Sequence, residues 1–198
     1  MKLQQGKWFR RLLAVSAGVL LSTASAAFAA STTSGNGTLT VTATVNPSIS
    51  LTFNTATGGP TLTGAGTNAA TLNFGNISAY GSEPTGVSLA SGSTSSLCSN
   101  CFVVSAPVSI VVNGSDVTTS SGFSLTAELG SADNYYWGVN TSTTVPSEVL
   151  TSSAATSVIS TGTYGSAGNT VYVFLGVSNG SVVTSQPDNT IEFIASAN

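Results

Sequence analysis

The sequence after residue 30 is dominated by alternating apolar and polar positions, the pattern of a half-buried β-strand. The first such stretch, residues 36–53, places threonine, serine or asparagine on even-numbered positions. Pro47 interrupts it, and because proline lacks a backbone N–H we expect an edge strand or a bend there. The apolar side chains on odd-numbered positions are Leu39, Val41, Ala43, Val45, Ile49, Leu51 and Phe53.

Later stretches repeat this alternation, and none of them has a convincing helical period. Residues 102–112 place apolar side chains on even-numbered positions. Asn113-Gly114 then predicts a two-residue hairpin turn, because both residues tolerate positive φ. Residues 169–183 predict a second hairpin with its turn at Asn179-Gly180, and apolar side chains on both faces predict that its first strand is central. The other expected strands cover residues 70–80, 85–91, 122–129, 134–140, 157–161 and 189–197.

About nine or ten such strands predict an all-β fold, a single immunoglobulin-like or jelly-roll β-sandwich. We place the sandwich domain at residues 54–198 and a separate N-terminal strand region at residues 30–53. Disorder is the alternative for a chain this rich in Ser, Thr and Gly, but the regular aliphatic alternation argues against it. We expect Leu72 to share a face with Phe74, and Val87 to share a face with Leu89. Residues 54–69 and 91–100 are the segments that we expect to be mobile loops.

The first 29 residues have the pattern of a secretory signal peptide. Lys2, Lys7, Arg10 and Arg11 precede an apolar run that ends near Leu21, and Ala27-Phe28-Ala29 fits a cleavage site. An uncleaved membrane anchor is the alternative, but the run is short for a span of about 20 apolar residues. We therefore expect a secreted protein at the bacterial cell surface, with no membrane span in the mature chain.

Charge excludes several classes of function. All four basic residues lie in the signal, so residues 30–198 carry seven acidic side chains and no Lys, Arg or His. The mature chain has no cationic side chains to bind the phosphates of a nucleic acid. It also has no histidine to act as the base of a Ser-His-Asp triad. Paired-carboxylate glycosidase chemistry remains possible by count, but no spacing pairs the acids. We expect no enzyme activity, no cofactor and no metal; Asp133-Asn134 could bind calcium, and a plain turn is the simpler interpretation.

The two cysteines form the motif Cys98-Ser99-Asn100-Cys101. Redox catalysis would require a helix after the first cysteine, and a strand follows instead. A zinc site would need two further ligands. A local disulfide in an oxidising compartment is the prediction, with a bridge between subunits as the alternative.

The densest aromatic cluster is Tyr135-Tyr136-Trp137, in which Tyr135 and Trp137 share a parity. One interpretation is a stacking platform for sugars, as in a carbohydrate-binding module or adhesin. The other is core packing by one parity and exposure of the other. The two interpretations differ in whether Trp137 is accessible.

The opening strand supplies the functional hypothesis. It can pair within its own sandwich and turn a corner at Asn46-Pro47, or residues 36–46 can complete the sheet of another copy. Strand addition takes affinity from backbone hydrogen bonds and specificity from alternate side chains, here Leu39, Val41, Ala43 and Val45. We therefore expect a non-enzymatic structural subunit whose partners are copies of itself and that forms a fibre, pilus or coat. A monomeric adhesin that binds glycans or other cell-surface components is the alternative.

Three stretches carry a resemblance: TLTVTATVNPSISLTF, LNFGNISAYG and the terminal NTIEFIASAN. They resemble bacterial pilin and spore-coat-U-like subunits, and biofilm-fibre subunits that exchange N-terminal strands. The resemblance implies an immunoglobulin-like fold, export and polymerisation at the surface. The chain departs from pilins because its cysteines are neighbours and it lacks a near-terminal tyrosine.

Overall fold

The structure, a computed structural model, describes residues 49–79, 81–91, 97–115, 120–165, 167–179 and 187–198. These residues lie in one compact unit, residues 47–198, and form eight strands and no helix. No helix within them is long or apolar enough to cross a membrane. The strands are β1 (Ile49–Thr55), β2 (Ser88–Ser91), β3 (Cys101–Gly114), β4 (Phe123–Leu129), β5 (Tyr136–Asn140), β6 (Thr156–Gly162), β7 (Asn169–Ser178) and β8 (Ile191–Ala197).

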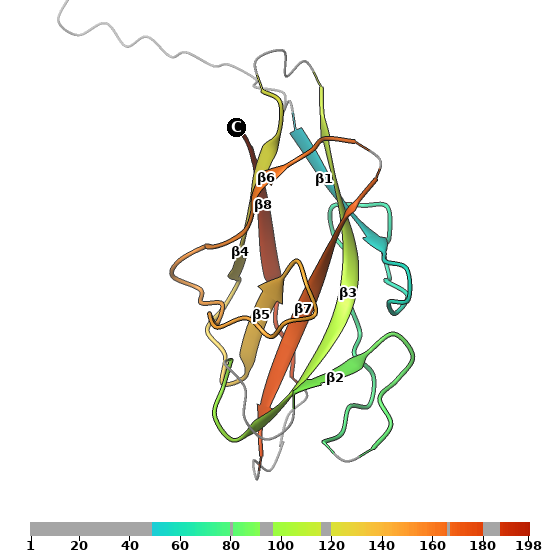
Figure 1. The fold of residues 1–198 in the computed structure, drawn as a ribbon, viewed down its shortest axis with the longest axis vertical. Helices are drawn as coiled ribbons and strands as arrows, with labels where there is room; N and C mark the ends of the chain where they lie inside the picture. Colours follow the sequence, from blue (N-terminus) through green and yellow to red (C-terminus); the bar gives the residue numbers. More distant parts are fainter. Residues whose placement is uncertain (1–48, 80, 92–96, 116–119, 166, 180–186) are drawn as a thin grey trace, which may run out of the picture. The chain divides into compact units, whose positions relative to one another are not determined.

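The strands form two antiparallel sheets, which confirms the predicted all-β sandwich (Figure 1). The first sheet has the order β1-β3-β7-β5, with β2 also paired to β3. The second sheet has the order β6-β4-β8. The 14-residue β3 is long enough to pair with both β1 and β2, β1 along residues 108–114 and β2 along residues 103–105.

The core lies between the sheets and follows the alternation of the sequence. Strand β4 buries Phe123, Leu125, Ala127 and Leu129 and leaves the residues between them half-buried. Burial of each large apolar side chain contributes roughly 1.5 to 3 kcal/mol. The opposing sheet contributes to the same cluster from the even-numbered positions of β3 and the odd-numbered positions of β7, among them Val104, Ile110, Val112, Val171 and Leu175.

The first sheet is also covered on its outer face, which confirms that β7 is central and buried on both sides. Phe174 packs there in a second cluster with Leu97, Cys101 and Val103. Gly138 in β5 permits this close cover, because a Cβ atom there would lie 2.6 Å from Pro146 Cγ.

One predicted turn and one predicted strand are wrong. Asn113 and Gly114 do not form a hairpin turn but extend β3, where they pair with Ser50 and Ile49. The next strand, β4, belongs to the other sheet, so the chain crosses between sheets here instead of turning back.

Residues 70–79 form no strand beyond a single bridge between Thr63 and Thr71. The Gly75 N–H donates to Asn73 Oδ1 at 2.8 Å, and Gly75 has a φ of 68°, so a local turn competes with extension.

Two predicted faces have different outcomes. Leu72 and Phe74 do share a face, since both are half-buried against the core. Val87 and Leu89 do not share an environment: Val87 is buried and Leu89 is 46% exposed. The register of β2 on β3 shifts between Leu89 and Ser91, and an irregular ladder weakens the simple alternation of faces. The signal peptide, residues 36–46 and the return strand after Asn179-Gly180 lie outside the described residues.

Candidate functional site

One lateral side of the sandwich brings together the edge strands of the two sheets, β1 and β8. In the described residues, the neighbouring strand of β1 is β3 and that of β8 is β4, and β1 has one further isolated bridge from Phe53 to Thr67. The two edges meet through side chains: the Phe53 and Phe193 rings contact edge-to-face with centroids 5.7 Å apart. No ladder joins β1 to β8 in this part of the chain, and we call this gap the open seam.

Among the described residues, none pairs with the backbone edge of β8 that faces the open seam. The Thr190 carbonyl accepts from the Gly130 N–H at 2.8 Å, and the Asn198 N–H donates to the Gly122 carbonyl at 3.0 Å. The backbone N–H and C=O groups of the even-numbered residues of this strand therefore face β4. Because backbone groups alternate between the two sides of a strand, the N–H and C=O of the odd-numbered residues face away from β4. Those residues are Ile191, Phe193, Ala195 and Ala197.

The free edge of β1 is shorter. The Phe53 N–H donates to the Thr67 carbonyl at 2.8 Å, and the Phe53 carbonyl accepts from the Gly66 N–H at 2.7 Å. The segment that follows β1 thus occupies this edge at Phe53. The same alternation directs the backbone groups of Ile49 and Leu51 toward the seam, and no described residue pairs with them there.

A groove of about 1540 Å³ extends from the open seam over the inner face of the first sheet. We call it the β8 groove. Three backbone segments line it, Ile49–Phe53, Gly66–Ile77 and Pro187–Ile194, together with Leu62. Its remaining lining comes from apolar side chains of the first sheet: Phe102, Val108, Trp137, Val173, Leu175 and Val177.

The electrostatics of the β8 groove favour an uncharged occupant. Asp188 and Glu192 are the charged residues of its described lining, and both are acidic. No basic side chain exists in residues 30–198 to neutralise them. An occupant with acidic side chains would be repelled, whereas an apolar strand flanked by hydroxyl groups would not.

A hydrogen-bond cluster holds one side of the groove in place. Asp133 Oδ2 accepts from Trp137 Nε1 at 2.6 Å and from Asn189 Nδ2 at 3.3 Å. Asn189 Nδ2 also donates to the Ser131 carbonyl at 3.1 Å. These bonds attach the residues before β8 to β5 and to the loop between β4 and β5. Sequence analysis missed Asn189, because 56 residues separate it from Asp133.

The hydrogen bonds also set the charge state of Asp133. Burial alone would raise the pKa of this carboxyl group. The bonds from Trp137, Asn189 and the backbone N–H groups of Asn134 and Tyr135 outweigh burial and lower the pKa below its ordinary value of 3.8. The carboxylate is therefore ionised at neutral pH, as an acceptor of several N–H groups should be. Among the described residues, no three His, Cys, Asp or Glu side chains gather as a metal site would need.

The aromatic residues Tyr135, Tyr136 and Trp137 do not share one exposed surface. Trp137 is only 6% exposed, and its ring contacts Phe74 with centroids 6.5 Å apart. Tyr135 is half-buried against the same core. Tyr136 lies on the opposite face of β5, in the outer cluster. A sugar-stacking platform needs an accessible ring face, and the buried indole does not present one.

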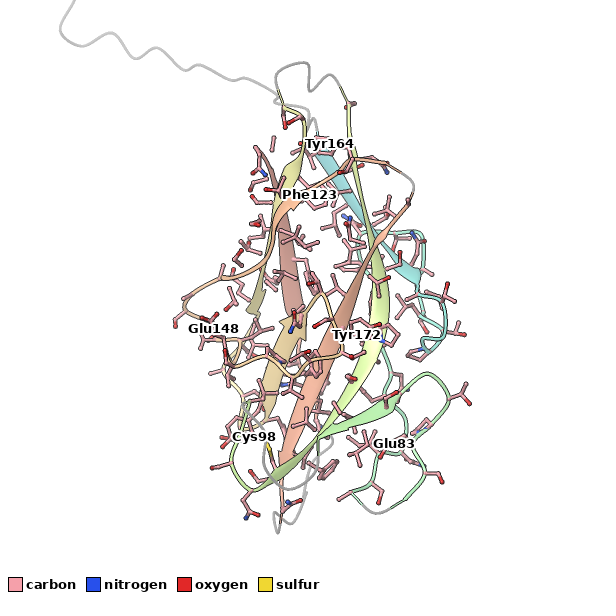
Figure 2. The ribbon with its side chains drawn as sticks, in the orientation of Figure 1. Glu83, Cys98, Phe123, Glu148, Tyr164 and Tyr172 are labelled. Atoms are coloured by element: carbon pink, nitrogen blue, oxygen red, sulfur yellow. A yellow bond between two sulfur atoms is a disulfide. The ribbon has the colours of Figure 1, made fainter. Side chains whose placement is uncertain are left out.

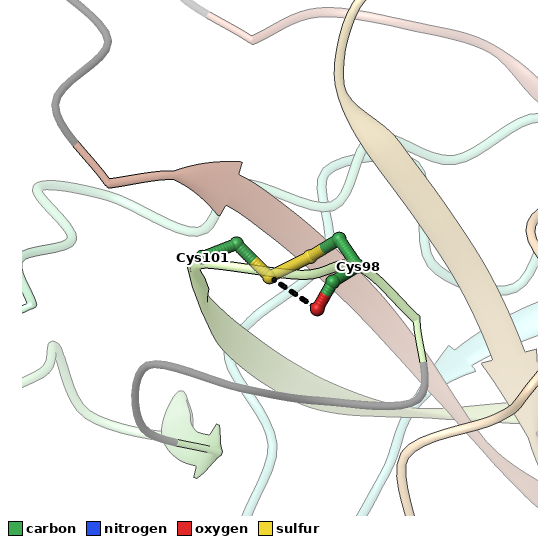
Figure 3. Close-up of a disulfide and its surroundings, with 2 residues drawn as sticks. All are labelled: Cys98 and Cys101. Atoms are coloured by element: carbon green, nitrogen blue, oxygen red, sulfur yellow. Dashed lines mark hydrogen bonds between the residues drawn. A yellow bond between two sulfur atoms is a disulfide. The ribbon is translucent and has the colours of Figure 1, made fainter.

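The disulfide between Cys98 and Cys101 is present within the chain, as predicted (Figure 3). It leaves no free cysteine for a bridge between subunits. Both cysteines are buried in the outer cluster beside Phe174, and Cys101 Sγ lies 3.2 Å from the Cys98 carbonyl oxygen. The bond therefore fastens the outer cover of the first sheet, on the face opposite the groove.

The predicted assembly residues Leu39, Val41, Ala43 and Val45 lie outside the described residues, so the structure shows the groove and not the strand. Comparison of the chain with protein-family models, curated proteins and solved structures finds no match.

Proposed function

We propose that the chain is a secreted, non-enzymatic structural subunit that self-assembles at the cell surface by β-strand exchange. Residues 36–46 of one copy occupy the β8 groove of the next. The observation that carries the proposal is a groove with an apolar floor, beside a strand edge that no described residue pairs with, in a chain whose sequence also has an alternating apolar segment before β1. Export through a cleaved signal at residues 1–29 and an immunoglobulin-like arrangement belong to the same proposal.

The length of the strand suits the groove. Leu39 to Val45 are seven residues, and Pro187 to Ile194, which line the groove, are eight. At about 3.3 Å per residue, these segments span about 23 Å and about 26 Å. The four apolar side chains of the strand can therefore all face the groove along its length.

The chemistry of the strand also suits the groove. Its odd-numbered side chains are Leu, Val, Ala and Val, and residues 30–48 carry no charge. Burial of the three larger side chains would contribute roughly 1.5 to 3 kcal/mol each. New backbone bonds to the odd-numbered residues of β8 add to this. Both contributions favour the contact and offset the cost of ordering the strand.

Only the odd-numbered side chains of the strand are apolar, so the strand should place that face in the groove. This gives a test with a matched control. We expect Val41→Asn to abolish filaments of residues 30–198, because it would bury an amide without hydrogen-bond partners in the apolar part of the groove. Thr40→Asn introduces the same amide one position away, on the face that points outward, and should leave filaments intact. Electron microscopy and size-exclusion chromatography measure both outcomes.

The deletion of residues 36–46 isolates the acceptor. The shortened protein should be a folded monomer that binds a synthetic peptide of residues 36–46 saturably at a one-to-one ratio. Filaments formed by the Val41→Asn variant, or failure of the monomer to bind the peptide, would contradict the proposal. A wild-type protein that stays monomeric and binds glycans would favour the adhesin alternative instead.

A further inference from the structure

We infer that a pocket on the outer face of the first sheet binds an uncharged hexose ring. The pocket has a volume of about 470 Å³, and sites for small molecules typically measure about 300 to 1,000 Å³. We call it the outer pocket. It lies on the face of the sheet opposite the β8 groove, so the inference does not depend on the proposed strand exchange.

The outer pocket lies where two strands share one edge of β3. Strand β1 pairs with residues 108–114 of β3 and β2 pairs with residues 103–105, so Pro107 lies in the interval between them. Proline has no backbone N–H, and its place in this interval therefore leaves no donor without a partner. The segment that follows β1 and the segment that leads into β2 form two walls of the pocket, with Gly58 and Gly86 in its lining.

Two close backbone contacts hold these walls in place. Gly59 packs directly on β3, because a Cβ atom there would lie 2.5 Å from the Pro107 carbonyl oxygen. Gly86 has a φ of 84° and packs against the backbone nitrogen of Pro60, where a side chain would not fit. Both walls are therefore fixed to the sandwich at positions that require glycine.

The third wall is the loop after β5, which contributes Thr143. Asn140 shapes this loop from both sides: its Nδ2 donates to the Thr144 carbonyl at 2.8 Å, and its Oδ1 accepts from the Thr141 N–H at 2.8 Å. Asn140 also pairs with Tyr172 of β7. The loop is thus attached to the strand that carries the aromatic ring of the pocket, and the three walls are formed before any ligand binds.

The lining combines one aromatic ring with several hydroxyl groups. Tyr172 is half-buried and pairs with Pro107, and Figure 2 shows it between Tyr164 toward one end of the molecule and Cys98 toward the other. The face of an aromatic ring carries negative partial charge and attracts the C–H groups on the flat side of a sugar ring. Hydroxyl groups can both donate to and accept from the hydroxyl groups of a sugar. Those of the lining belong to Thr57, Ser88, Ser105, Thr143 and Tyr172.

Ser105 is the residue that points most directly to a ligand. It is 4% exposed and is the one polar side chain among the fully buried residues that the structure describes. Its neighbours on the outer face of β3, Val103 and Cys101, are apolar. No described residue forms a hydrogen bond with the Ser105 hydroxyl group, which lines the pocket. Its partner is therefore whatever occupies the pocket, and a ligand hydroxyl group can replace water there.

Charge restricts the class of ligand. No charged residue belongs to the described lining of the outer pocket, and residues 30–198 have no basic side chain that could bind a phosphate, sulfate or carboxylate group. The seven acidic side chains of this part of the chain would repel such ligands. A purely apolar ligand would leave the lining hydroxyl groups without partners. An uncharged ring that carries hydroxyl groups satisfies both conditions.

Titrations with four uncharged sugars test the inference on residues 30–198. The probes are the methyl glycosides of glucose, galactose, mannose and N-acetylglucosamine, and binding is measured by saturation-transfer NMR and calorimetry. We expect at least one to bind with a dissociation constant on the order of a millimolar. Methyl glucuronide, which adds a carboxylate group, should bind at least about tenfold more weakly. The absence of binding by all four sugars would overturn the inference, and so would preferred binding of the glucuronide.

Variants of two lining residues locate the binding site. Ser105→Ala should weaken binding about three- to tenfold without lowering the melting temperature, since no described residue loses a hydrogen bond. Tyr172→Leu should weaken binding at least about tenfold, whereas Tyr172→Phe keeps the ring and should lose less than about threefold. Ser109→Ala is the matched control, because it makes the same change on the same face of β3 outside the pocket. Equal losses at Ser105 and Ser109, or unchanged binding in the Ser105→Ala and Tyr172→Leu variants, would exclude the outer pocket as the site.

Assembly is measured on the same proteins and separates this inference from the proposed function. The Tyr172→Leu variant should form filaments in normal yield, because Tyr172 lies on the face opposite the groove. Filaments that bind none of the four sugars would overturn the sugar site alone. Monomers that bind sugar through Tyr172 and Ser105 would support the sugar site and overturn the strand exchange.

Discussion

The two lateral sides of the sandwich differ in how the sheets are joined. On one side, which we call the closed seam, the Leu150 N–H donates to the Trp137 carbonyl of β5 at 2.8 Å. There the Leu129 N–H of β4 also donates to the Thr151 carbonyl at 3.0 Å. On the other side, the open seam, β1 and β8 meet through Phe53 and Phe193 without a backbone ladder in the described residues.

Chain connectivity explains this difference. Strands β5 and β6 belong to different sheets and follow one another, so the chain between them must cross the side of the sandwich. That crossing segment satisfies the backbone groups of both sheets. Strands β1 and β8 are the first and last strands of the described chain, and no loop connects them. Within the described residues, no connecting segment therefore joins the two sheets across the open seam.

The largest effect is expected from closing the open seam within one subunit. Pro47→Asp combined with Ser48→Gly supplies a three-residue turn that permits residues 36–46 to fold back beside β1. We expect this variant to form monomers in place of filaments, as measured by size-exclusion chromatography and electron microscopy. Ser48→Gly alone retains Pro47 and is the control, which should still assemble. Unchanged filament yield in the double variant would mean that the connection does not limit the choice of partner.

A smaller effect is expected at the closed seam, on stability instead of assembly. Leu150 is 2% exposed, so Leu150→Ala should lower the free energy of unfolding by about 2 to 5 kcal/mol. Leu89→Ala is the matched control, because the same change at an exposed leucine should cost less than about 0.5 kcal/mol. Urea unfolding of the monomer lacking residues 36–46 measures both values. Equal losses at the two positions would show that the crossing segment contributes little to the core.

The smallest effect is expected from the Asp133 cluster, which supports the groove beside the open seam. The pKa of the Asp133 carboxyl group is lowered in the folded protein. Its contribution to the free energy of unfolding is therefore complete well above pH 3.8 and is lost as the pH falls below 3.8 through the folded pKa. Asp133→Asn removes this titration and should reduce the acid-dependent loss of stability by about 1 kcal/mol. Thermal unfolding of both proteins between pH 7 and about pH 2 checks this. Identical pH profiles would show that the cluster is not coupled to folding.

Strong local alternation made most strands predictable. Phe123 to Leu129 and Val171 to Val177 repeat apolar residues every second position, and both became strands with the expected buried face. The local disulfide followed from the two cysteines alone. The exceptions are informative: Asn113-Gly114 has the local preference of a turn, but pairing with β1 keeps it extended. Tertiary pairing overrides turn propensity when the partner strand is long enough.

The groove could not be predicted in the same way, since it depends on contacts between distant residues. The bond from Asn189 to Asp133 and the contact of Phe53 with Phe193 join segments separated by 56 and 140 positions. The buried position of Trp137 likewise depends on Phe74 and Asp133. No local pattern in the sequence encodes these contacts.

The sequence by itself determined the all-β character, the buried face of the regular strands, the lack of basic side chains after residue 30 and an alternating segment before β1. These properties follow from composition and from the local backbone preferences of individual residues, which do not depend on the rest of the fold. Only the tertiary structure decided that the β1 and β8 edges lie side by side without a ladder between them in the described part of the chain, and that β1 begins at the end where β8 finishes. Those facts depend on how two sheets pack, because the space between elements is a property of their arrangement and not of any single segment.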